Sequence, residues 1–401
     1  MTAAMLKQQS AFSALVDQPA DALLALIGQY RDDPRSEKID LGLGVYRDET
    51  GSTPIMAAVK EAELVLHREQ LTKSYLAPEG DARFVSLLAN VVFGAILTSD
   101  PHLIGVQTPG GTGALRMAGD LINRGNPDAT IWIGYPSWAN HVPIFQASGL
   151  KVVKHPFFQQ STQTLEFDAM LDALELTAPG DALLLHGCCH NPSGANLSID
   201  QWHVLIELMD RKGVLPIVDL AYQGLGAGLD EDAFGARLCL SSLPEVLIAY
   251  SCDKNFGLYR ERVGALWAKG RNVKNTELLR TNMLSLARSN WSMPPDHGAA
   301  LVRIILDDAQ LRAAWKTELI CMRLRIRSLR TALALSDDRL QPLAAQSGMF
   351  SLLPIRKDAV VALRADHGIY LANPSRINIA GLQIEQVEPF VSALALYLVP
   401  A

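Results

Sequence analysis

The chain has 401 residues, of which 49% are hydrophobic, so it is long enough to bury two cores and predicts two domains. Its formal net charge of −6 is opposite to the basic surface that non-specific nucleic-acid binding requires, and no apolar run is long enough to span a bilayer. Five cysteines, an odd number in a large chain, indicate reduced thiols rather than a disulfide framework. We therefore expect a globular, cytoplasmic protein that binds neither nucleic acid nor membrane.

The N-terminal part of the chain predicts a helix over about residues 19–31, followed by a glycine-containing segment at 38–46. Gly42 and Gly44 do not complete a dinucleotide-binding fingerprint, because Arg47 stands where a third glycine is needed. The two glycines instead allow the backbone to pass close to another group.

From about residue 55 to 310, short apolar segments alternate with helical ones. Such alternation predicts an α/β fold with a mainly parallel sheet covered by helices on both faces. The clearest strands are expected at residues 130–134, 150–153, 182–186, 214–219 and 245–250.

One long helix is predicted after Asp307, because an apolar stripe at helical spacing runs from Leu311 through Ala314 to Leu333. Five basic residues are expected off this stripe: Arg312, Lys316, Arg323, Arg327 and Arg330. A helix of this length can connect two domains. We expect residues 1–53 to form an N-terminal segment and part of a small domain. Residues 54–310 then form the large domain, and 311–401 the connecting helix and a small C-terminal α+β domain.

A glycine-rich stretch at residues 107–115 opens a predicted helix. Gly111 and Thr112 would present backbone N–H groups and a hydroxyl to an anion at the helix N-terminus. The stretch is not a P-loop, because no Gly-Lys-Ser/Thr follows it. An ordinary glycine-rich turn with a helix cap fits the pattern equally well.

Two further loops carry aromatic and sulfur-containing side chains. Trp138 is placed to stack on a planar ring, although a buried tryptophan belongs more often to a core. Cys188 and Cys189 suggest zinc, but adjacent cysteines lack the usual spacing between ligands, so we expect no metal. The turn that begins at Asn191, with a cis proline, is the better functional candidate.

Three charged residues, Asp219, Lys254 and Arg376, stand where strands end or loops begin. Asp219 ends an apolar run and needs a cation such as a protonated pyridine nitrogen, unless it caps a helix. Lys254 follows another apolar run; with Ser251 before it and an arginine after it, it suits Schiff-base chemistry on a phosphate-bearing aldehyde. Arg376 can hold a carboxylate with its planar guanidinium. For both cations the simpler alternative is an exposed surface residue.

These motifs together resemble the fold-type I, pyridoxal-phosphate-dependent aminotransferases of class I, and most of all the bacterial aspartate and aromatic amino acid aminotransferases. The resemblance covers nearly the whole chain, from residues 41–46 to 376–381. It implies a large domain with a mainly parallel seven-stranded sheet between helices, a smaller α+β domain, and pyridoxal 5'-phosphate as cofactor.

The resemblance also implies a role for each motif. Lys254 would bond covalently to the cofactor and shuttle the proton between substrate and cofactor, and Asp219 would pair with the pyridine nitrogen. Arg376 would bind the substrate α-carboxylate near the backbone of Gly44. The remaining positions would surround the cofactor: Trp138 stacks on its ring, Tyr222 and Asn191 bond its phenolic oxygen, and Gly111, Thr112, Ser251 and Arg262 hold its phosphate. His141 and His186 match positions near the aspartate.

Two residues would act across the interface of a homodimer. Tyr75 would reach the phosphate of the partner subunit's cofactor. Arg288 matches the arginine that binds the distal carboxylate of aspartate, glutamate or 2-oxoglutarate, and in related enzymes this arginine swings aside to admit an aromatic side chain.

The chain departs from the family at Asp253, because a small residue, commonly serine, usually precedes the lysine. A carboxylate beside a phosphate dianion repels it unless the side chain points away or pairs with a cation such as Arg260. We expect weaker cofactor retention, with a higher affinity after the substitution Asp253→Ser.

The expected function is ping-pong transamination between pyridoxal and pyridoxamine forms of the cofactor. The donors are aspartate and/or the aromatic amino acids tyrosine, phenylalanine and tryptophan, and the acceptor is 2-oxoglutarate or oxaloacetate. One alternative is a pyridoxal-phosphate-dependent lyase of the same fold. Another is a catalytically impaired homologue with a binding or regulatory role, which only Asp253 supports.

Overall fold

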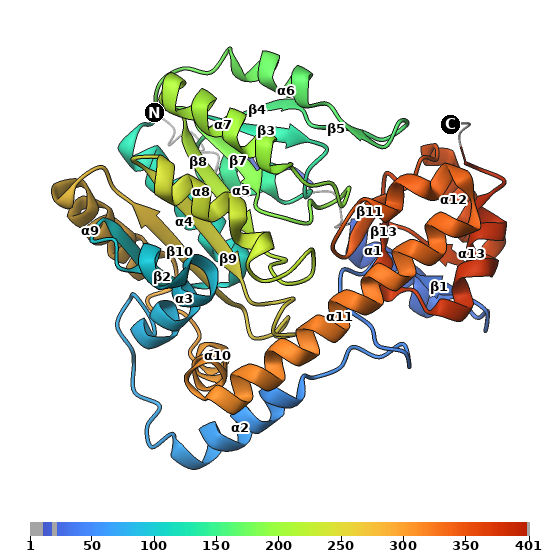
Figure 1. Cartoon of the computed structure of the whole chain (residues 1–401), viewed down its shortest axis with the longest axis horizontal. Helices are drawn as coiled ribbons and strands as arrows, with labels where there is room; N and C mark the ends of the chain where they lie inside the picture. Colours follow the sequence, from blue (N-terminus) through green and yellow to red (C-terminus); the bar gives the residue numbers. More distant parts are fainter. Residues whose placement is uncertain (1–10, 18–21, 399–401) are drawn as a thin grey trace, which may run out of the picture.

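A seven-stranded sheet forms the centre of the large domain in this computed structural model, which describes residues 11–17 and 22–398 (Figure 1). The strand order is β2-β10-β9-β8-β7-β3-β4. Strand β10 is antiparallel to both of its neighbours, and the four other pairs are parallel. The mainly parallel seven-stranded sheet is therefore confirmed. Its strands are β2 (Leu103–Pro109), β3 (Thr130–Tyr135), β4 (Lys151–Pro156), β7 (Ala182–His186), β8 (Leu215–Leu220), β9 (Val246–Ser251) and β10 (Val263–Lys269).

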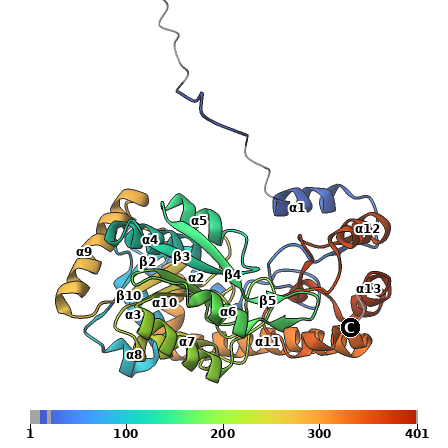
Figure 2. The same ribbon diagram turned by 90° about the horizontal axis from the view of Figure 1, so that it is seen from above.

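Helices cover both faces of this sheet, as the strand pattern predicted. Successive residues of β3 enter different cores: Ile131 and Ile133 pack in one, and Trp132 packs in the other. Figure 2 shows α4 and α5 on one side of the sheet and α7 and α8 on the other. The covering helices are α3 (Ala82–Thr98), α4 (Gly110–Gly125), α5 (His141–Ala147), α6 (Phe167–Leu174), α7 (Ile199–Lys212), α8 (Phe234–Ser242) and α9 (Val273–Asn290).

The long helix predicted after Asp307 is α11, which spans Ala309–Ser336 and runs from beneath the large domain to the C-terminal elements (Figure 1). It packs with α2 (Ala57–Glu69) and α10 (His297–Asp307). Most of the predicted stripe is buried, at Trp315, Leu319, Met322, Ile326, Leu329 and Leu333.

Two positions of α11 correct the sequence pattern. Ala314, which was expected on the stripe, is exposed, and Arg330, which was expected off it, is only 2% exposed. The Arg330 guanidinium donates hydrogen bonds to the carbonyls of Leu343, Ser347, Gly348 and Phe350 and to the Ser351 hydroxyl. A cation is tolerated there because distant backbone oxygens surround it, and helical periodicity cannot register such partners.

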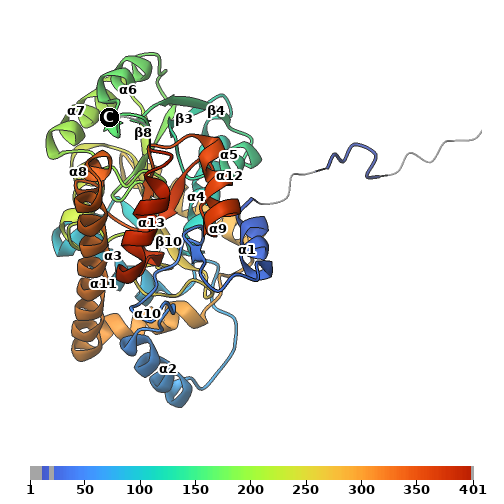
Figure 3. The ribbon, with the colours of Figure 1, turned by 90° about the vertical axis from the view of Figure 1, so that its right-hand side faces the viewer.

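The small domain combines both ends of the chain. Strand β1 (Ile39–Asp40) pairs in parallel with β12 (Ile369–Tyr370), and β11 (Phe350–Leu352) pairs with β13 (Arg376–Asn378). Figure 3 shows α1 (Ala22–Asp32) on the same side of the molecule as α12 (Lys357–His367), with α13 (Val387–Leu394) nearby. The helix expected at residues 19–31 thus begins, in the described part, at Ala22. The limits 1–53, 54–310 and 311–401 stay a prediction.

The remaining elements are short. They are β5 (Phe158–Gln159), β6 (Thr164–Leu165) and the 3-10 helices Glu231–Ala233, Asp338–Ala344, Ile379–Gly381 and Ile384–Gln386. Among the described residues, the helices are all too short or too polar to cross a membrane.

Candidate active site

A cavity of about 280 Å³ lies where the carboxyl ends of β7, β8 and β9 face the small domain. Ligands of open parallel sheets bind at this edge, where several loops converge. The cavity brings together eleven of the predicted site residues: Gly44, Gly111, Thr112, Trp138, Asn191, Asp219, Tyr222, Ser251, Lys254, Arg262 and Arg376.

Asp219 lies within strand β8 and is not the N-cap of a helix. Its Oδ2 is 3.0 Å from His141 Nε2, and Ser137 Oγ lies 2.8 Å from the other ring nitrogen of His141. Burial raises the pKa of Asp219, but the hydrogen bond with His141, followed by electrostatic interactions with His141, His186 and Lys254, outweighs this effect and lowers the pKa overall. The buried carboxylate is therefore ionised at neutral pH and suited to pairing with a cationic ligand atom.

His186 stands behind this pair, with its ring centre 5.1 Å from that of His141. Burial, followed by the neighbouring His141, lowers the pKa of His186 to about 3. The His186 ring is thus neutral and adds no charge beside the Asp219 carboxylate.

Lys254 points into the cavity and is not a surface lysine, since only 19% of its side chain is exposed. Its Nζ lies 3.7 Å from Asp253 Oδ2 and 5.5 Å from the centre of the Tyr222 ring. The amine therefore stands between the loop after β9 and the loop after β8, in reach of a ligand that fills the cavity.

A chain of polar contacts links the two domains across the cavity. Asn191, at a cis Asn–Pro bond as predicted, donates from Nδ2 to Tyr222 OH at 3.1 Å. Arg376 donates from Nη1 to Asn191 Oδ1 at 3.5 Å and from Nη2 to Gly42 O at 2.8 Å. Burial raises the pKa of Tyr222, so its phenol keeps its proton at neutral pH.

Arg376 is held over a ring that the sequence analysis did not assign to the site. Its guanidinium carbon is 4.5 Å from the centre of the Phe350 ring. Burial lowers the pKa of Arg376, and its Nε is buried with no hydrogen-bond acceptor among the described residues. A donor thus remains for an anionic ligand, and Arg376 is not a surface residue. Phe350 could not be assigned from the sequence, because its strand reaches Arg376 only through the pairing of β11 with β13, in which Leu352 is the partner of Arg376.

The N-terminus of α4 faces Ser251 and Arg262. Gly110 has φ +69°, and a Cβ there would lie 2.6 Å from Arg262 Nη2. A Cβ on Gly111 would lie 3.1 Å from the Ser251 Cβ. The two glycines therefore keep open a small space that is bounded by backbone N–H groups, a hydroxyl and a guanidinium, which is the chemistry of a phosphate site.

Asp253 pairs with Arg262 and not with Arg260, the cation that the sequence suggested. Its Oδ2 accepts a hydrogen bond from Arg262 Nη1 at 2.7 Å. The reason is the β9–β10 hairpin, which brings residue 262 back beside the end of β9.

Trp138, Tyr75 and Arg288 differ in their position relative to the cavity. Trp138 lines it, with its ring perpendicular to that of His141 at 5.2 Å. Tyr75 is 91% exposed and lies outside the cavity of its own chain. Arg288 is also outside it, on the last turn of α9, and donates to Ser292 Oγ at 2.5 Å.

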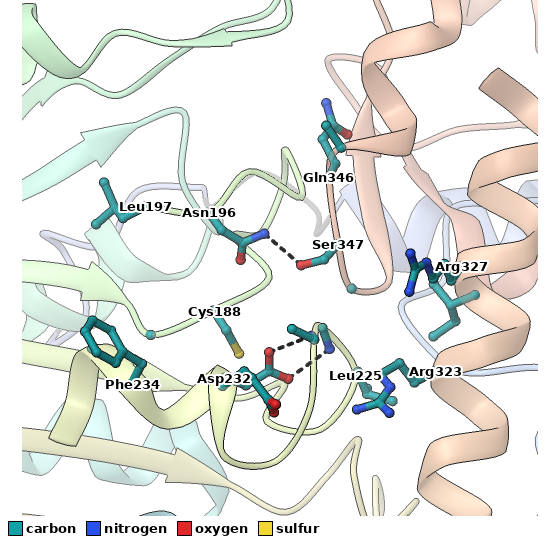
Figure 4. A pocket seen from close by; sticks show the side chains of 18 of the residues that line it. Cys188, Asn196, Leu197, Leu225, Asp232, Phe234, Arg323, Arg327, Gln346 and Ser347 are labelled. Carbon is teal, nitrogen blue, oxygen red and sulfur yellow. Dashed lines mark hydrogen bonds between the residues drawn. The ribbon is translucent and has the colours of Figure 1, made fainter. Parts of the chain in front are cut away.

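A larger cavity of about 710 Å³ lies between the large domain, α11 and residues 344–348 (Figure 4). Cys188 lines it, and the Cys188, Cys189 and Asp232 ligand atoms lie within 4.8 Å of one another. The Asp232 carboxylate, however, already accepts backbone N–H bonds from Gly224, Gly226 and Ala227. Because its oxygens are used in these hydrogen bonds to residues 224–227, the three side chains do not form a set of free metal ligands.

Comparison with known proteins identifies the family. A model of the aminotransferases of class I and II matches residues 36–394. The chain belongs to this family. This aminotransferase is 52% identical to the tyrosine aminotransferase of Rhizobium meliloti (strain 1021) over 93% of its own chain and 96% of that protein. It is 40% identical to the aspartate aminotransferase of Salmonella typhi over 96% of its chain and 100% of that protein.

A solved structure supports the same family. The aromatic-amino-acid aminotransferase from Burkholderia pseudomallei covalently bound to pyridoxal phosphate superposes with a TM-score of 0.94. Its sequence is 34% identical, and the match covers 97% of this chain and 99% of that one. The fold is therefore fold-type I, and the protein is a pyridoxal-phosphate-dependent aminotransferase that acts on amino acids and 2-oxo acids.

Proposed function

We propose that this aminotransferase takes the amino group from aspartate or an aromatic amino acid and transfers it to 2-oxoglutarate in two half-reactions. The observation that carries the proposal is the convergence of Lys254, Asp219 and Arg376 on one cavity. These side chains supply a buried amine, a buried carboxylate and a guanidinium with a free N–H. Transamination needs such groups at the substrate α-carbon, at the pyridine nitrogen and at the substrate α-carboxylate, respectively. The relatives named for tyrosine, aromatic and aspartate substrates support the choice of donors.

The residues present fit pyridoxal phosphate. The space that Gly110 and Gly111 keep open at the start of α4 accommodates the phosphate, with Thr112, Ser251 and Arg262 around it. When bound, the cofactor supplies an electron sink that stabilises negative charge at the substrate α-carbon. The Tyr222 hydroxyl and the Asn191 amide, 3.1 Å apart, are positioned to hydrogen-bond the cofactor's phenolic oxygen.

Asp219 and Lys254 control two protons, one on the pyridine nitrogen and one on the substrate α-carbon. The ionised Asp219 carboxylate holds the proton on the pyridine nitrogen, because its negative charge favours the protonated ring. His141 fixes the orientation of that carboxylate through its 3.0 Å contact. With the cofactor bound, the Lys254 amine would accept the proton from the substrate α-carbon and deliver it to the cofactor carbon C4′, and would carry it in the opposite direction in the second half-reaction.

Arg376 orients the substrate. Its planar guanidinium binds the α-carboxylate, and the Phe350 ring beneath it and the Gly42 carbonyl beside it keep the group in place. Gly44 leaves the backbone close to the substrate: a Cβ there would lie 2.9 Å from the Phe350 ring. Trp138 closes the cavity on the side of His141 and excludes water from the ring face.

The active unit is a homodimer in the cytoplasm that binds no nucleic acid. Exposed Tyr75, with Leu71 also almost fully exposed, supports a role at the phosphate of a neighbouring subunit. Arg288 serves as the distal-carboxylate ligand across the same interface. The four buried cysteines are free thiols, which is consistent with a reducing compartment.

The test begins with purified protein loaded with pyridoxal phosphate. Aspartate, tyrosine, phenylalanine and tryptophan are added separately, and the cofactor absorbance and the released 2-oxo acid are followed. We expect the absorbance band to be lost with stoichiometric release of 2-oxo acid, and to return when 2-oxoglutarate is added. Release of ammonia or carbon dioxide without an acceptor would indicate a lyase, and an unchanged spectrum would contradict the transaminase. Lys254→Ala provides the inactive control.

A further inference from the structure

Asp253 and Arg262 face each other across the mouth of the β9–β10 hairpin. Ser251 and Gly264 are partners in this antiparallel pair, and Cys252 N donates to Val263 O at 2.9 Å. The hairpin thus fixes the backbone on both sides of the pair. Arg262, directly before β10, has φ +54°, a left-handed backbone conformation that non-glycine residues rarely adopt.

The buried Asp253 carboxylate lines the same cavity as the residues proposed to hold the cofactor phosphate. Its side chain is 8% exposed, and its Oδ2 lies 2.7 Å from Arg262 Nη1 and 3.7 Å from Lys254 Nζ. Ser251 Oγ accepts a hydrogen bond from Asp253 N at 3.2 Å. A group of cations and donors that would attract a phosphate therefore already contains its own anion, which solvent screens poorly.

The two nitrogens at the end of Arg262 face different partners. Nη1 donates to Asp253 Oδ2 and to the Tyr259 carbonyl, whereas Nη2 is directed at Gly110, where a Cβ would lie 2.6 Å away. Asp253 Oδ1 is buried with no hydrogen-bond partner among the described residues. A phosphate dianion has only acceptor oxygens, so it cannot satisfy Oδ1 and repels it.

We propose that Asp253 is an internal competitor of the cofactor phosphate, which neutralises Arg262 in the cofactor-free protein and reduces what the phosphate contributes to cofactor affinity. The proposal rests on the proposed function, because it takes the start of α4 as the phosphate site. The expected consequence is selective: the affinity for the phosphorylated cofactor is reduced, but the affinity for the same ring without a phosphate is not.

The experiment compares pyridoxal 5'-phosphate with pyridoxal, which has no phosphate. Dissociation constants of both are measured by equilibrium dialysis on cofactor-free wild-type protein and on the variants Asp253→Asn and Asp253→Ser. In both variants, we expect pyridoxal phosphate to bind at least about tenfold more tightly, and pyridoxal to change by less than about threefold. The ratio of the two dissociation constants isolates the phosphate from effects on the ring or on Lys254.

Glu261→Gln is the matched control, because it removes a carboxylate next to Arg262 whose side chain lies instead against Gly298. We expect an unchanged ratio in this variant, and circular dichroism spectra of all variants like that of the wild type. An unchanged ratio in Asp253→Asn and Asp253→Ser, or equal tightening of both compounds, overturns the proposal alone. Wild-type protein that binds neither compound would overturn the proposed function together with this proposal.

Discussion

Replacing Arg376 by lysine tests the substrate side of the active site in the most direct way. Lysine keeps the positive charge but offers a point charge in place of a planar fork, so it cannot bond both oxygens of a carboxylate at once. It also leaves the Gly42 carbonyl without its 2.8 Å donor and no longer stacks over Phe350.

The magnitude follows from the contacts that are lost. One hydrogen bond to a charged carboxylate is worth about 1.5–3 kcal/mol. A loss of about 3 kcal/mol, at the upper end of this range because Arg376 is largely buried, corresponds to a loss of roughly 150-fold in kcat/KM for tyrosine with 2-oxoglutarate. The affinity for pyridoxal phosphate stays within about threefold of the wild type, since Arg376 lies away from the start of α4.

The assay measures kcat/KM and the cofactor dissociation constant side by side. Arg356→Lys is the control, because Arg356 is in the same domain but its side chain is 80% exposed and pairs with Asp358. Both parameters should remain unchanged in that variant. Wild-type kcat/KM in Arg376→Lys, or a cofactor affinity that falls as much as kcat/KM does, would contradict the role of Arg376 in binding the substrate carboxylate.

Three further outcomes are expected. Asp219→Asn keeps the shape but removes the charge that holds the pyridine proton, so kcat should fall by about 100-fold or more, and a fall below threefold would contradict the assigned role. Arg330→Met leaves several buried carbonyls without a donor and should lower the free energy of unfolding in urea by about 3 kcal/mol, whereas exposed Arg327→Met should change it by less than about 0.5 kcal/mol. Burial lowers the pKa of His155 to about 4, so below pH 6.5 the unfolded chain binds a proton that the folded chain does not. The free energy of unfolding is therefore unaffected by His155 above pH 6.5 and decreases as the pH falls toward 4, by about 2 kcal/mol between pH 7.5 and 5. His155→Gln should remove this decrease, and an equally steep decrease in the variant would count against the assignment.

Local patterns in the sequence were sufficient for the main elements. The strand expected at residues 182–186 coincides with β7, and the apolar stripe from Trp315 to Leu333 lies on one continuous helix. Both patterns depend only on the spacing of apolar residues along a few turns or one strand, and each residue type keeps that preference wherever the segment packs.

Contacts between distant segments were not predictable in the same way. Arg330 was misplaced because its acceptors belong to residues 343–351, and Phe350 was missed because its strand meets Arg376 only through the pairing of β11 with β13. Asp253 was assigned the wrong arginine, because the hairpin and not the distance along the chain decides which guanidinium it meets.

The family of the chain, its cofactor and the residue types at the site could be predicted without a structure, because they depend on motifs that follow one another in a fixed order along the chain. The contacts between these residues depend on how the chain folds. The tertiary structure places the Asn191 amide between Tyr222 and Arg376, and it leaves Tyr75 and Arg288 outside the cavity of their own chain. Hydrogen bonds and ion pairs act over a few ångströms in space, whereas the site residues that form them are separated by up to 334 positions in the chain, as Arg376 is from Gly42.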